Sequence, residues 1–179
     1  MSQPDDVLIE FFKTLQGDLM ILGIGGKIGT ELGILAVNAI KASGVDRRVY
    51  GVSRFSRDGS DAFLKENGIE TIRCDLQDRE QVEALPEVEN IIFLAGKKFG
   101  STDNIEETWG MNVIVPHIVA ERFSRSRMVI YSSGNIYAFV DRGSGGSLEK
   151  QLMVKETASR AMRPLTINDG AHASGLVWS

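Results

Sequence analysis

Residues 18–33 read DLMILGIGGKIGTELG, and this stretch decides the expected fold. Residues 19–22 are wholly apolar, which is typical of a strand buried on both faces of a parallel sheet. A glycine-rich turn at 23–29 follows, and residues 31–43 then place apolar side chains at helical spacing. A buried strand, a glycine turn and a helix in this order predict the first unit of a parallel α/β sheet.

The same alternation continues outward from this stretch. Residues 4–16 are expected to form an amphipathic helix, and Gly44 is expected to end the helix that follows the glycine turn. Pro116 should bend the longest helix or open one of its hydrogen bonds. Further strands are expected at 48–53, 69–74, 90–95 and 127–132, with helices at 58–67, 78–85 and 103–123. This pattern predicts a Rossmann-type, doubly wound parallel sheet in three α/β/α layers, with strand order 3-2-1-4-5.

The C-terminal region has a different character. Residues 141–147 (DRGSGGS) are rich in Gly and Ser, and no strand is expected after residue 148. A helix over 151–162 is expected, with Pro164 ending it. We therefore expect the C-terminal part of the fold to be incomplete. The expected division is a domain at 1–140, opened by a helix within 1–16, and an irregular extension at 141–179 without a complete substrate domain.

Composition and charge exclude several classes of protein. The chain of 179 residues has one cysteine, so it cannot form an internal disulfide. No apolar run reaches the roughly 18 residues of a membrane span, and the acidic start lacks the basic region of a signal peptide. The net charge of -4 gives no electrostatic signature for nucleic acid or an anionic membrane. With only two histidines beside that cysteine, no metal site is expected either. The sequence predicts a soluble, cytoplasmic protein.

The glycine turn has the features of a phosphate-binding loop. Glycines let the backbone approach a pyrophosphate, and the helix N-terminus offers N–H groups and a partial positive charge to an anion. The spacing fits G-x-x-G-x-x-G, whereas Ile28 stands in the third glycine position of G-x-G-x-x-G and no P-loop lysine follows. A tight turn without a ligand is the alternative. The residues expected to bind a dinucleotide here are Gly23, Gly25, Gly26, Lys27, Ile28 and Gly29.

The end of the second strand bears on which dinucleotide is bound. NAD sites usually hold the adenosine ribose with a carboxylate at this point. Here Ser53 and Arg54 end the strand, and no carboxylate follows until Asp58. Arg54 is suited to a 2′-phosphate, with Ser53 as a small hydrogen-bonding neighbour, so NADP is favoured over NAD. The alternative is that Arg54 and Arg57 are a solvated pair on a loop.

Further motifs occur in a fixed order along residues 18–140. The glycine turn is followed by Cys74-Asp75-Leu76, by Ala95-Gly96, by Met111-Asn112-Val113 and by Ser132-Ser133-Gly134-Asn135-Ile136-Tyr137. On these residues the chain resembles the NAD(P)-dependent epimerase/dehydratase family, the extended short-chain dehydrogenase/reductases. The resemblance implies that Asp75, with Leu76, lies near adenine and that Ala95, Gly96 and Asn112 line the cofactor site. It also implies that Ser133 hydrogen-bonds the substrate oxygen that is oxidised.

The chain departs from the family at the catalytic pair. In the family a Tyr acts as general acid/base, and a Lys four residues later lowers the pKa of that Tyr. No Tyr-x-x-x-Lys occurs in this sequence, and the corresponding position falls near Thr157. The resemblance implies an epimerase or dehydratase acting on a nucleotide sugar or another small hydroxyl compound. A non-catalytic NAD(P)-binding module and a truncated or frame-shifted relative remain alternative functions. For the oligomeric state, a homodimer remains open.

Other residues have plainer interpretations. Lys97 and Lys98 are expected to be solvated loop residues after the fourth strand. Cys74 is expected to be a buried packing thiol. Trp109 and Met111 are expected to face the core from their helix.

Overall fold

The computed structural model describes residues 3–56, 59–97 and 104–131, together with the backbone of three later strands at 152–155, 162–165 and 176–178. The chain forms two units, Met1–Ser126 and Arg127–Ser179. The predictions for Arg57, Asp58, Lys98, Ser133 and Tyr137 lie outside the described residues.

A parallel sheet forms the centre of the first unit. Its strands are β1 (Leu19–Leu22), β2 (Val49–Ser53), β3 (Glu70–Arg73) and β4 (Asn90–Phe93). β1 pairs in parallel with both β2 and β4, and β2 pairs in parallel with β3. All residues of β1 are buried, as its unbroken apolar run predicts. The sheet order begins β3-β2-β1-β4-β5, so the predicted Rossmann-type fold and its strand order are confirmed.

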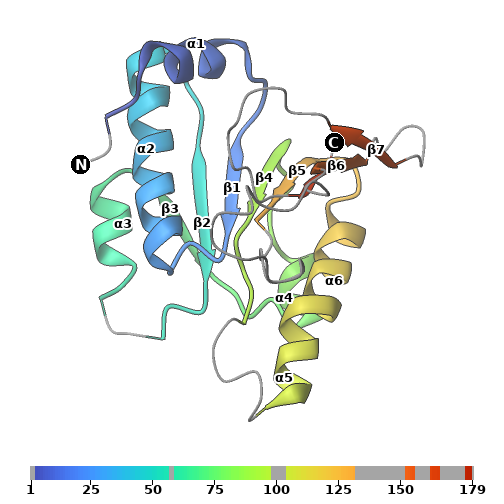
Figure 1. The fold of residues 1–179 in the computed structure, drawn as a ribbon. Coiled ribbons are helices and arrows are strands. Elements are labelled where there is room, and N and C mark those ends of the chain that lie inside the picture. The colour runs from blue at the N-terminus through green and yellow to red at the C-terminus, as the bar shows by residue number, and fades with distance from the viewer. Residues whose placement is uncertain are drawn as a thin grey trace, which may run out of the picture. The chain divides into compact units, whose positions relative to one another are not determined.

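Helices cover both faces of this sheet. In Figure 1, α2 (Lys27–Ser43) and α3 (Ala62–Glu66) lie on one side of it, and α4 (Arg79–Glu83) and α6 (Val115–Arg122) lie on the other. Helix α1 (Asp6–Thr14) packs against α2 and begins where the Asp5 carboxylate accepts a hydrogen bond from Leu8 N at 2.8 Å. Gly44 ends α2 in the left-handed conformation with φ +73°, as predicted.

The longest predicted helix is divided into three parts. It comprises α5 (Ile105–Trp109), the π-helical turn η1 (Gly110–Ile114) and α6. Pro116 has no N–H to donate to the carbonyl four residues earlier, which is that of Asn112. Just before it, the N–H of Val115 donates to the carbonyl of Gly110 five residues earlier, which is the π pattern. The disturbance predicted from Pro116 is therefore found, and it takes the form of a wider turn.

One core cluster of the first unit lies where α1 and α2 pack on the sheet. Its most deeply buried members include Ile21 and Ile24 from the first βα unit and Ile69, which directly precedes β3, each at most 2% exposed. Burying each such side chain contributes about 1.5–3 kcal/mol. This packing fixes the turn between β1 and α2, because Ile24 belongs to that turn and is itself fully buried.

The second unit contains strands that the sequence analysis did not predict. β5 (Arg127–Ile130) pairs antiparallel with β8 (Leu176–Trp178), and β6 (Leu152–Lys155) pairs antiparallel with β7 (Met162–Leu165) and parallel with β8. The expected helix over 151–162 is wrong, and so is the expectation of no strand after residue 148. Short apolar runs fit helix and strand alike, and the proline that seemed to end a helix lies in β7, an edge strand, where its missing N–H is tolerated. The domain boundary placed at residue 140 stays a prediction.

Across the residues that the structure describes, no helix is both long enough and apolar enough to cross a bilayer.

Candidate functional site

The turn after β1 packs tightly against the backbone that follows β4. Gly23 has φ +91°, a conformation that side chains rarely adopt, and the N–H groups of Gly23 and Ile24 both donate to Val52 O, at 2.9 and 3.2 Å. A Cβ on Gly23 would lie 2.7 Å from the backbone nitrogen of Ala95. Only glycine therefore fits here. The predicted loop residues Gly23 and Ala95 are in direct contact.

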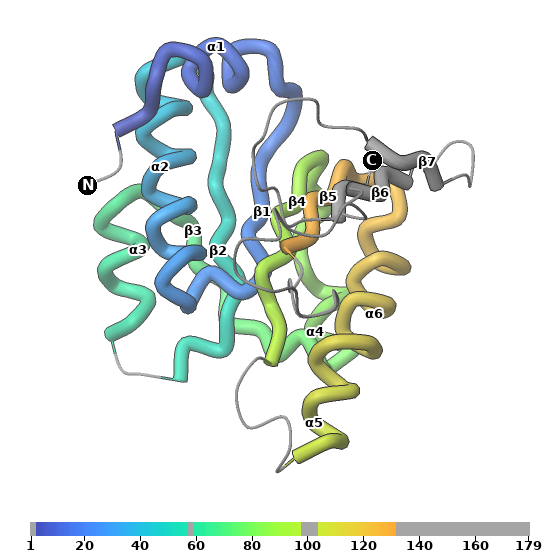
Figure 2. Tube along the Cα trace, in the orientation of Figure 1, coloured from blue at the N-terminus to red at the C-terminus, as the bar shows by residue number. Residues whose placement is uncertain are grey.

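The glycine turn leads directly into the N-terminus of α2, which no side chain caps. The tube in Figure 2 shows β1 turning straight into α2. Gly26 is the N-cap of α2, no side chain caps it, and the first turn carries no acidic residue. Gly25, Gly26, Lys27 and Ile28 are exposed, with Ile28 66% exposed. Backbone N–H groups at the start of a long helix, with a lysine beside them, form a favourable place for an anion.

Two further glycines of the turn differ in their surroundings. A Cβ on Gly29 would lie 2.7 Å from the Cα of Ile24, so this residue lets α2 approach the turn closely. A Cβ on Gly26 would meet nothing nearer than a carbonyl oxygen at 3.9 Å. The space over Gly26 is therefore open, as a bound phosphate would require.

Ser53, the last residue of β2, lies beside this turn, and Arg54 follows it along the chain. The Ser53 Oγ is 2.6 Å from the point where a Cβ on Gly25 would stand. Arg54 is exposed, and the next residue, Phe55, is 5% exposed with φ +45°. The Arg73 guanidinium donates to Arg54 O at 2.8 Å. The structure thus brings Gly25 and Ser53 together, and it places Arg73, which the sequence analysis did not single out, against the backbone of Arg54.

Asp75 and Leu76 follow β3 at the same edge of the sheet. Asp75 is half-buried, its N–H donates to the Gln81 side chain at 2.9 Å, and its carboxylate accepts from Gln77 N at 3.1 Å. Leu76 is buried, 7% exposed. The backbone of Asp75 is therefore held by Gln81 of α4, and its carboxylate is held by the N–H of Gln77.

Cys74 is buried, as predicted, and its N–H donates to Ser53 O at 3.1 Å. Burial raises the pKa of its thiol to about 11, and the charges of Asp75 and Asp78 add to the shift. This thiol is therefore neutral at physiological pH.

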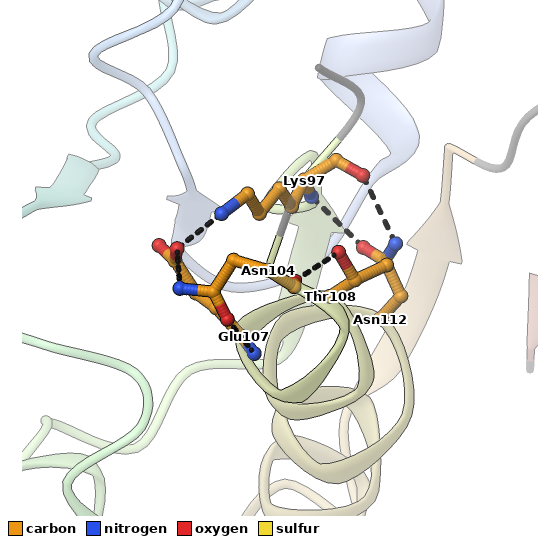
Figure 3. A network of polar contacts seen from close by, with 5 residues as sticks. All are labelled: Lys97, Asn104, Glu107, Thr108 and Asn112. Carbon is orange, nitrogen blue, oxygen red and sulfur yellow. Dashed lines mark hydrogen bonds and ion pairs between the residues drawn. The ribbon is translucent and has the colours of Figure 1, made fainter. Parts of the chain in front are cut away.

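The segment after β4 is held by a clamp from η1, shown in Figure 3. The Asn112 side chain accepts from Lys97 N at 2.8 Å and donates to Lys97 O at 3.0 Å. One amide thus pairs with both backbone groups of a single residue, as a neighbouring strand would. A Cβ on Gly96 would lie 3.3 Å from the Asn112 Oδ1, so glycine suits this position. The resemblance to the epimerase/dehydratase family implied that Asn112 lines the cofactor site, and the structure shows that its side chain binds the backbone of Lys97, directly after Ala95 and Gly96.

The same network holds the side chain of Lys97. Its ammonium pairs with the Glu107 carboxylate, and only 18% of the lysine side chain is exposed. Glu107 is itself bound by Asn104, whose side chain accepts from Glu107 N at 2.9 Å and donates to its carboxylate at 3.2 Å (Figure 3). The expectation that Lys97 is solvated is therefore wrong. Trp109 was expected in the core but is 61% exposed, and none of the residues of α5 is buried.

The described part of the site is suited to holding a nucleotide. The carboxyl ends of β1, β2 and β4 meet at one edge, at the bottom of Figure 1. The glycine turn follows β1, Arg54 follows β2, and Ala95 and Gly96 come shortly after β4. Ser133, the predicted catalytic hydroxyl, falls outside the described residues. Among the residues described, no cluster of His, Cys, Asp and Glu is suited to a metal ion.

Comparison with known proteins agrees at the level of the fold. No family model and no curated protein matches the sequence. An ADP-L-glycero-D-manno-heptose-6-epimerase from Helicobacter pylori matches with a TM-score of 0.61 at 18% identity, over 84% of this chain and 47% of that one. The epimerase Mth375 from Methanothermobacter thermautotrophicus gives 0.58 at 22% identity, over 78% and 42%. The Bordetella bronchiseptica enzyme WbmF, solved with NAD+ and UDP, gives 0.51 at 16% identity, over 74% and 41%.

These matches show that the chain has the Rossmann-like fold of epimerases, and that it spans less than half the length of each of the three.

The Asn112 clamp makes a testable prediction. Replacing Asn112 by Asp keeps an acceptor for Lys97 N but sets a carboxylate oxygen against Lys97 O. At neutral pH the free energy of unfolding should fall by about 1–3 kcal/mol, and much of it should return at acid pH, where the protonated carboxyl can donate. Urea unfolding at pH 7.5 and pH 4, near the ordinary pKa of an aspartic acid, measures this, with Asn112→Ala as the control that cannot recover. Equal stability of Asn112→Asp and the unchanged chain at both pH values would contradict the clamp.

The Cys74 thiol makes a second prediction. Because its folded pKa is about 11 and its ordinary value is 9.0, the thiolate at pH 8 should be about 100-fold scarcer in the folded chain. Alkylation by iodoacetamide should therefore be slower by at least about that factor than in the urea-unfolded chain. The stability that comes from keeping the thiol neutral is complete below pH 9 and is lost as the pH rises towards 11. Similar rates in folded and unfolded chains would show that Cys74 is accessible and unshifted.

Proposed function

We propose that this chain binds a nicotinamide dinucleotide, with the pyrophosphate over Gly25, Gly26 and the first turn of α2. The observation that carries the proposal is the open, uncapped N-terminus of α2, set at the edge where β1 and β4 end. Gly26 has open space above its Cα, and Lys27 is exposed beside it. These features satisfy what a pyrophosphate needs: close backbone approach, N–H donors and positive charge.

Within that proposal, Asp75 serves the adenine end and the wall Ala95–Gly96 serves the nicotinamide end. The Asp75 carboxylate is fixed by its own turn, and the wall is fixed by Asn112. Fixed groups bind more tightly, because less motion is lost when the ligand arrives. The bound dinucleotide would supply hydride transfer, and these residues would orient it.

For the activity, we propose epimerase/dehydratase chemistry on a nucleotide sugar or another small hydroxyl compound, in the cytoplasm, with Ser133 holding the substrate hydroxyl. Support comes from the ordered motifs of the sequence and from the epimerase fold. A second candidate is a module that binds the cofactor without turnover, as an intact or a truncated relative. The absence of Tyr-x-x-x-Lys favours it, because the general acid/base and the cation that lowers its pKa are both missing. A homodimer is compatible with either function.

Fluorescence titration with NADPH and NADH tests binding, and hydride exchange with a panel of nucleotide sugars then separates the two candidates. Binding with exchange supports the enzyme, whereas binding without exchange supports the module. Failure of both dinucleotides to bind would overturn the proposed function.

Gly26 offers a variant for this test that should keep the fold. Its φ of -81° and ψ of 163° suit any residue, so Gly26→Val should cost about 1 kcal/mol or less in unfolding free energy, mainly through poorer capping. The added side chain fills the space proposed for the pyrophosphate and should weaken dinucleotide binding at least about tenfold. Gly26→Ala is the graded control. Unchanged affinity in Gly26→Val would place the ligand elsewhere.

The preference for NADP is proposed from Arg54, which is exposed at the end of β2 with no carboxylate on β2 itself. Arg54→Asp should weaken NADPH binding by about tenfold or more and reverse the preference, because it exchanges attraction of the 2′-phosphate for repulsion. The ratio of the two dissociation constants measures this. An identical ratio before and after the substitution would remove Arg54 from the site.

A further inference from the structure

We propose that Arg73, at the end of β3, is a second specificity-determining residue for the nucleotide, and that it helps Arg54 to recognise a phosphate on the adenosine 2′-oxygen. The inference rests on the proposed dinucleotide function and deepens it. The sequence alone gave no reason to single out Arg73, since it lies two residues before the matched Asp75.

Strand register brings Arg73 to the end of β2. Arg73 is the last residue of β3, and in the parallel ladder it stands opposite Ser53, the last residue of β2. Its side chain is exposed at the carboxyl edge of the sheet, and the Arg73 Nη1 donates to Arg54 O at 2.8 Å. The guanidinium of Arg73 is therefore held at the backbone carbonyl of Arg54, the residue that is proposed to bind the 2′-phosphate.

The backbone around Arg54 is fixed from its other side as well. Phe55 is buried in the core at 5% exposure, although its φ of +45° is uncommon for a bulky residue. Such a conformation persists only where its surroundings hold it, and it is found most often at functional positions. A buried ring on one side and the Arg73 bond on the other together present Arg54 to solvent.

The two arginines have no acidic partner among the described residues. Arg48, Arg79 and Arg122 each form an ion pair with a carboxylate, whereas neither Arg54 nor Arg73 does so within the described ranges 3–56, 59–97 and 104–131. The charge of Arg73 helps to lower the pKa of the Asp61 carboxyl, but the larger cause is the hydrogen bond from Lys65. Asp61 forms its ion pair with Lys65, at 2.7 Å. Two guanidinium groups at one edge, neither of them in an ion pair with a described carboxylate, favour an anionic ligand.

A 2′-phosphate matches this arrangement in charge. A phosphate monoester carries about -1.5 to -2 charges at neutral pH, which one guanidinium compensates only in part. Planar guanidinium groups bind phosphate oxygens with paired hydrogen bonds. Arg73 contributes in two ways: it adds a second charge, and its bond to the carbonyl positions Arg54. NAD carries no group at this oxygen, so the contribution applies to NADP alone.

The test compares two small probes that differ only in this phosphate. Adenosine 2′,5′-bisphosphate and adenosine 5′-monophosphate are titrated into the full chain by calorimetry, for the unchanged protein and for Arg73→Gln. The control is Arg125→Gln, which changes the net charge equally. Arg125 is exposed on the loop between α6 and β5, on the side of the sheet where strands begin. NADPH and NADH are titrated in parallel, and urea unfolding records the stability of each variant.

Arg73→Gln should weaken the bisphosphate and NADPH by about 5- to 20-fold while leaving the monophosphate and NADH within about twofold. The preference should also shrink with added salt, as for exposed charges. In a double-substitution cycle, Arg54→Gln and Arg73→Gln should be non-additive, because one residue positions the other. A purely structural role would weaken all four ligands together and would not produce this split.

The failures of the two ideas are distinguishable. If the unchanged chain binds NADPH more tightly than NADH and Arg73→Gln leaves that ratio unchanged, the role of Arg73 is overturned and the proposed function stands. If Arg125→Gln alters the ratio as much as Arg73→Gln does, general charge rather than position is responsible, and the inference is again overturned. If the unchanged chain binds no dinucleotide, the proposed function is overturned, and so is this inference, which rests on it.

Discussion

The site depends on one close backbone contact, that of Gly23 with Ala95. Any side chain at Gly23 would stand 2.7 Å from a backbone nitrogen, and its φ of +91° also requires glycine. This contact seats the turn after β1 directly on the segment after β4. The start of α2 then opens over the switch point between β2 and β4, where open α/β sheets bind their ligands. Burial of the Ile24 side chain in the core also holds the turn in place.

Side chains that hydrogen-bond to backbone groups fix the segments that follow β2, β3 and β4 at this edge of the sheet. Arg73 holds the carbonyl of Arg54, Gln81 holds the N–H of Asp75, and Asn112 holds both groups of Lys97. Asn112 belongs to the π-helical turn before Pro116, and its amide binds the backbone of Lys97. A rigid edge of this kind binds a ligand at a lower cost in conformational entropy. The described residues therefore supply the groups that the proposed nucleotide binding needs, while the proposed chemistry depends on Ser133.

Much of the first unit was predictable because its signals are local. The apolar run at 19–22, the glycine turn and Gly44 each specify a strand, a turn or a helix end within a few residues, and the structure confirms them. Arg73 and the Asn112 clamp were not predictable, since they depend on strand register and on a contact fifteen residues apart. The strands β6 to β8 were missed because short apolar runs fit helix and strand equally well. Trp109 has helical spacing, but spacing alone does not say which side of a helix is covered.

The most direct test of the account follows backbone amide signals of the 15N-labelled chain by NMR during addition of NADPH. The account predicts saturable shifts centred on Gly25, Gly26, Lys27 and Ile28, because their N–H groups would face the pyrophosphate. Smaller shifts are expected at Asp75 and Gly96, and Arg125 should stay unchanged. Saturation with no shift in the glycine turn, or shifts centred on another face of the chain, would contradict the claim that this turn binds a dinucleotide.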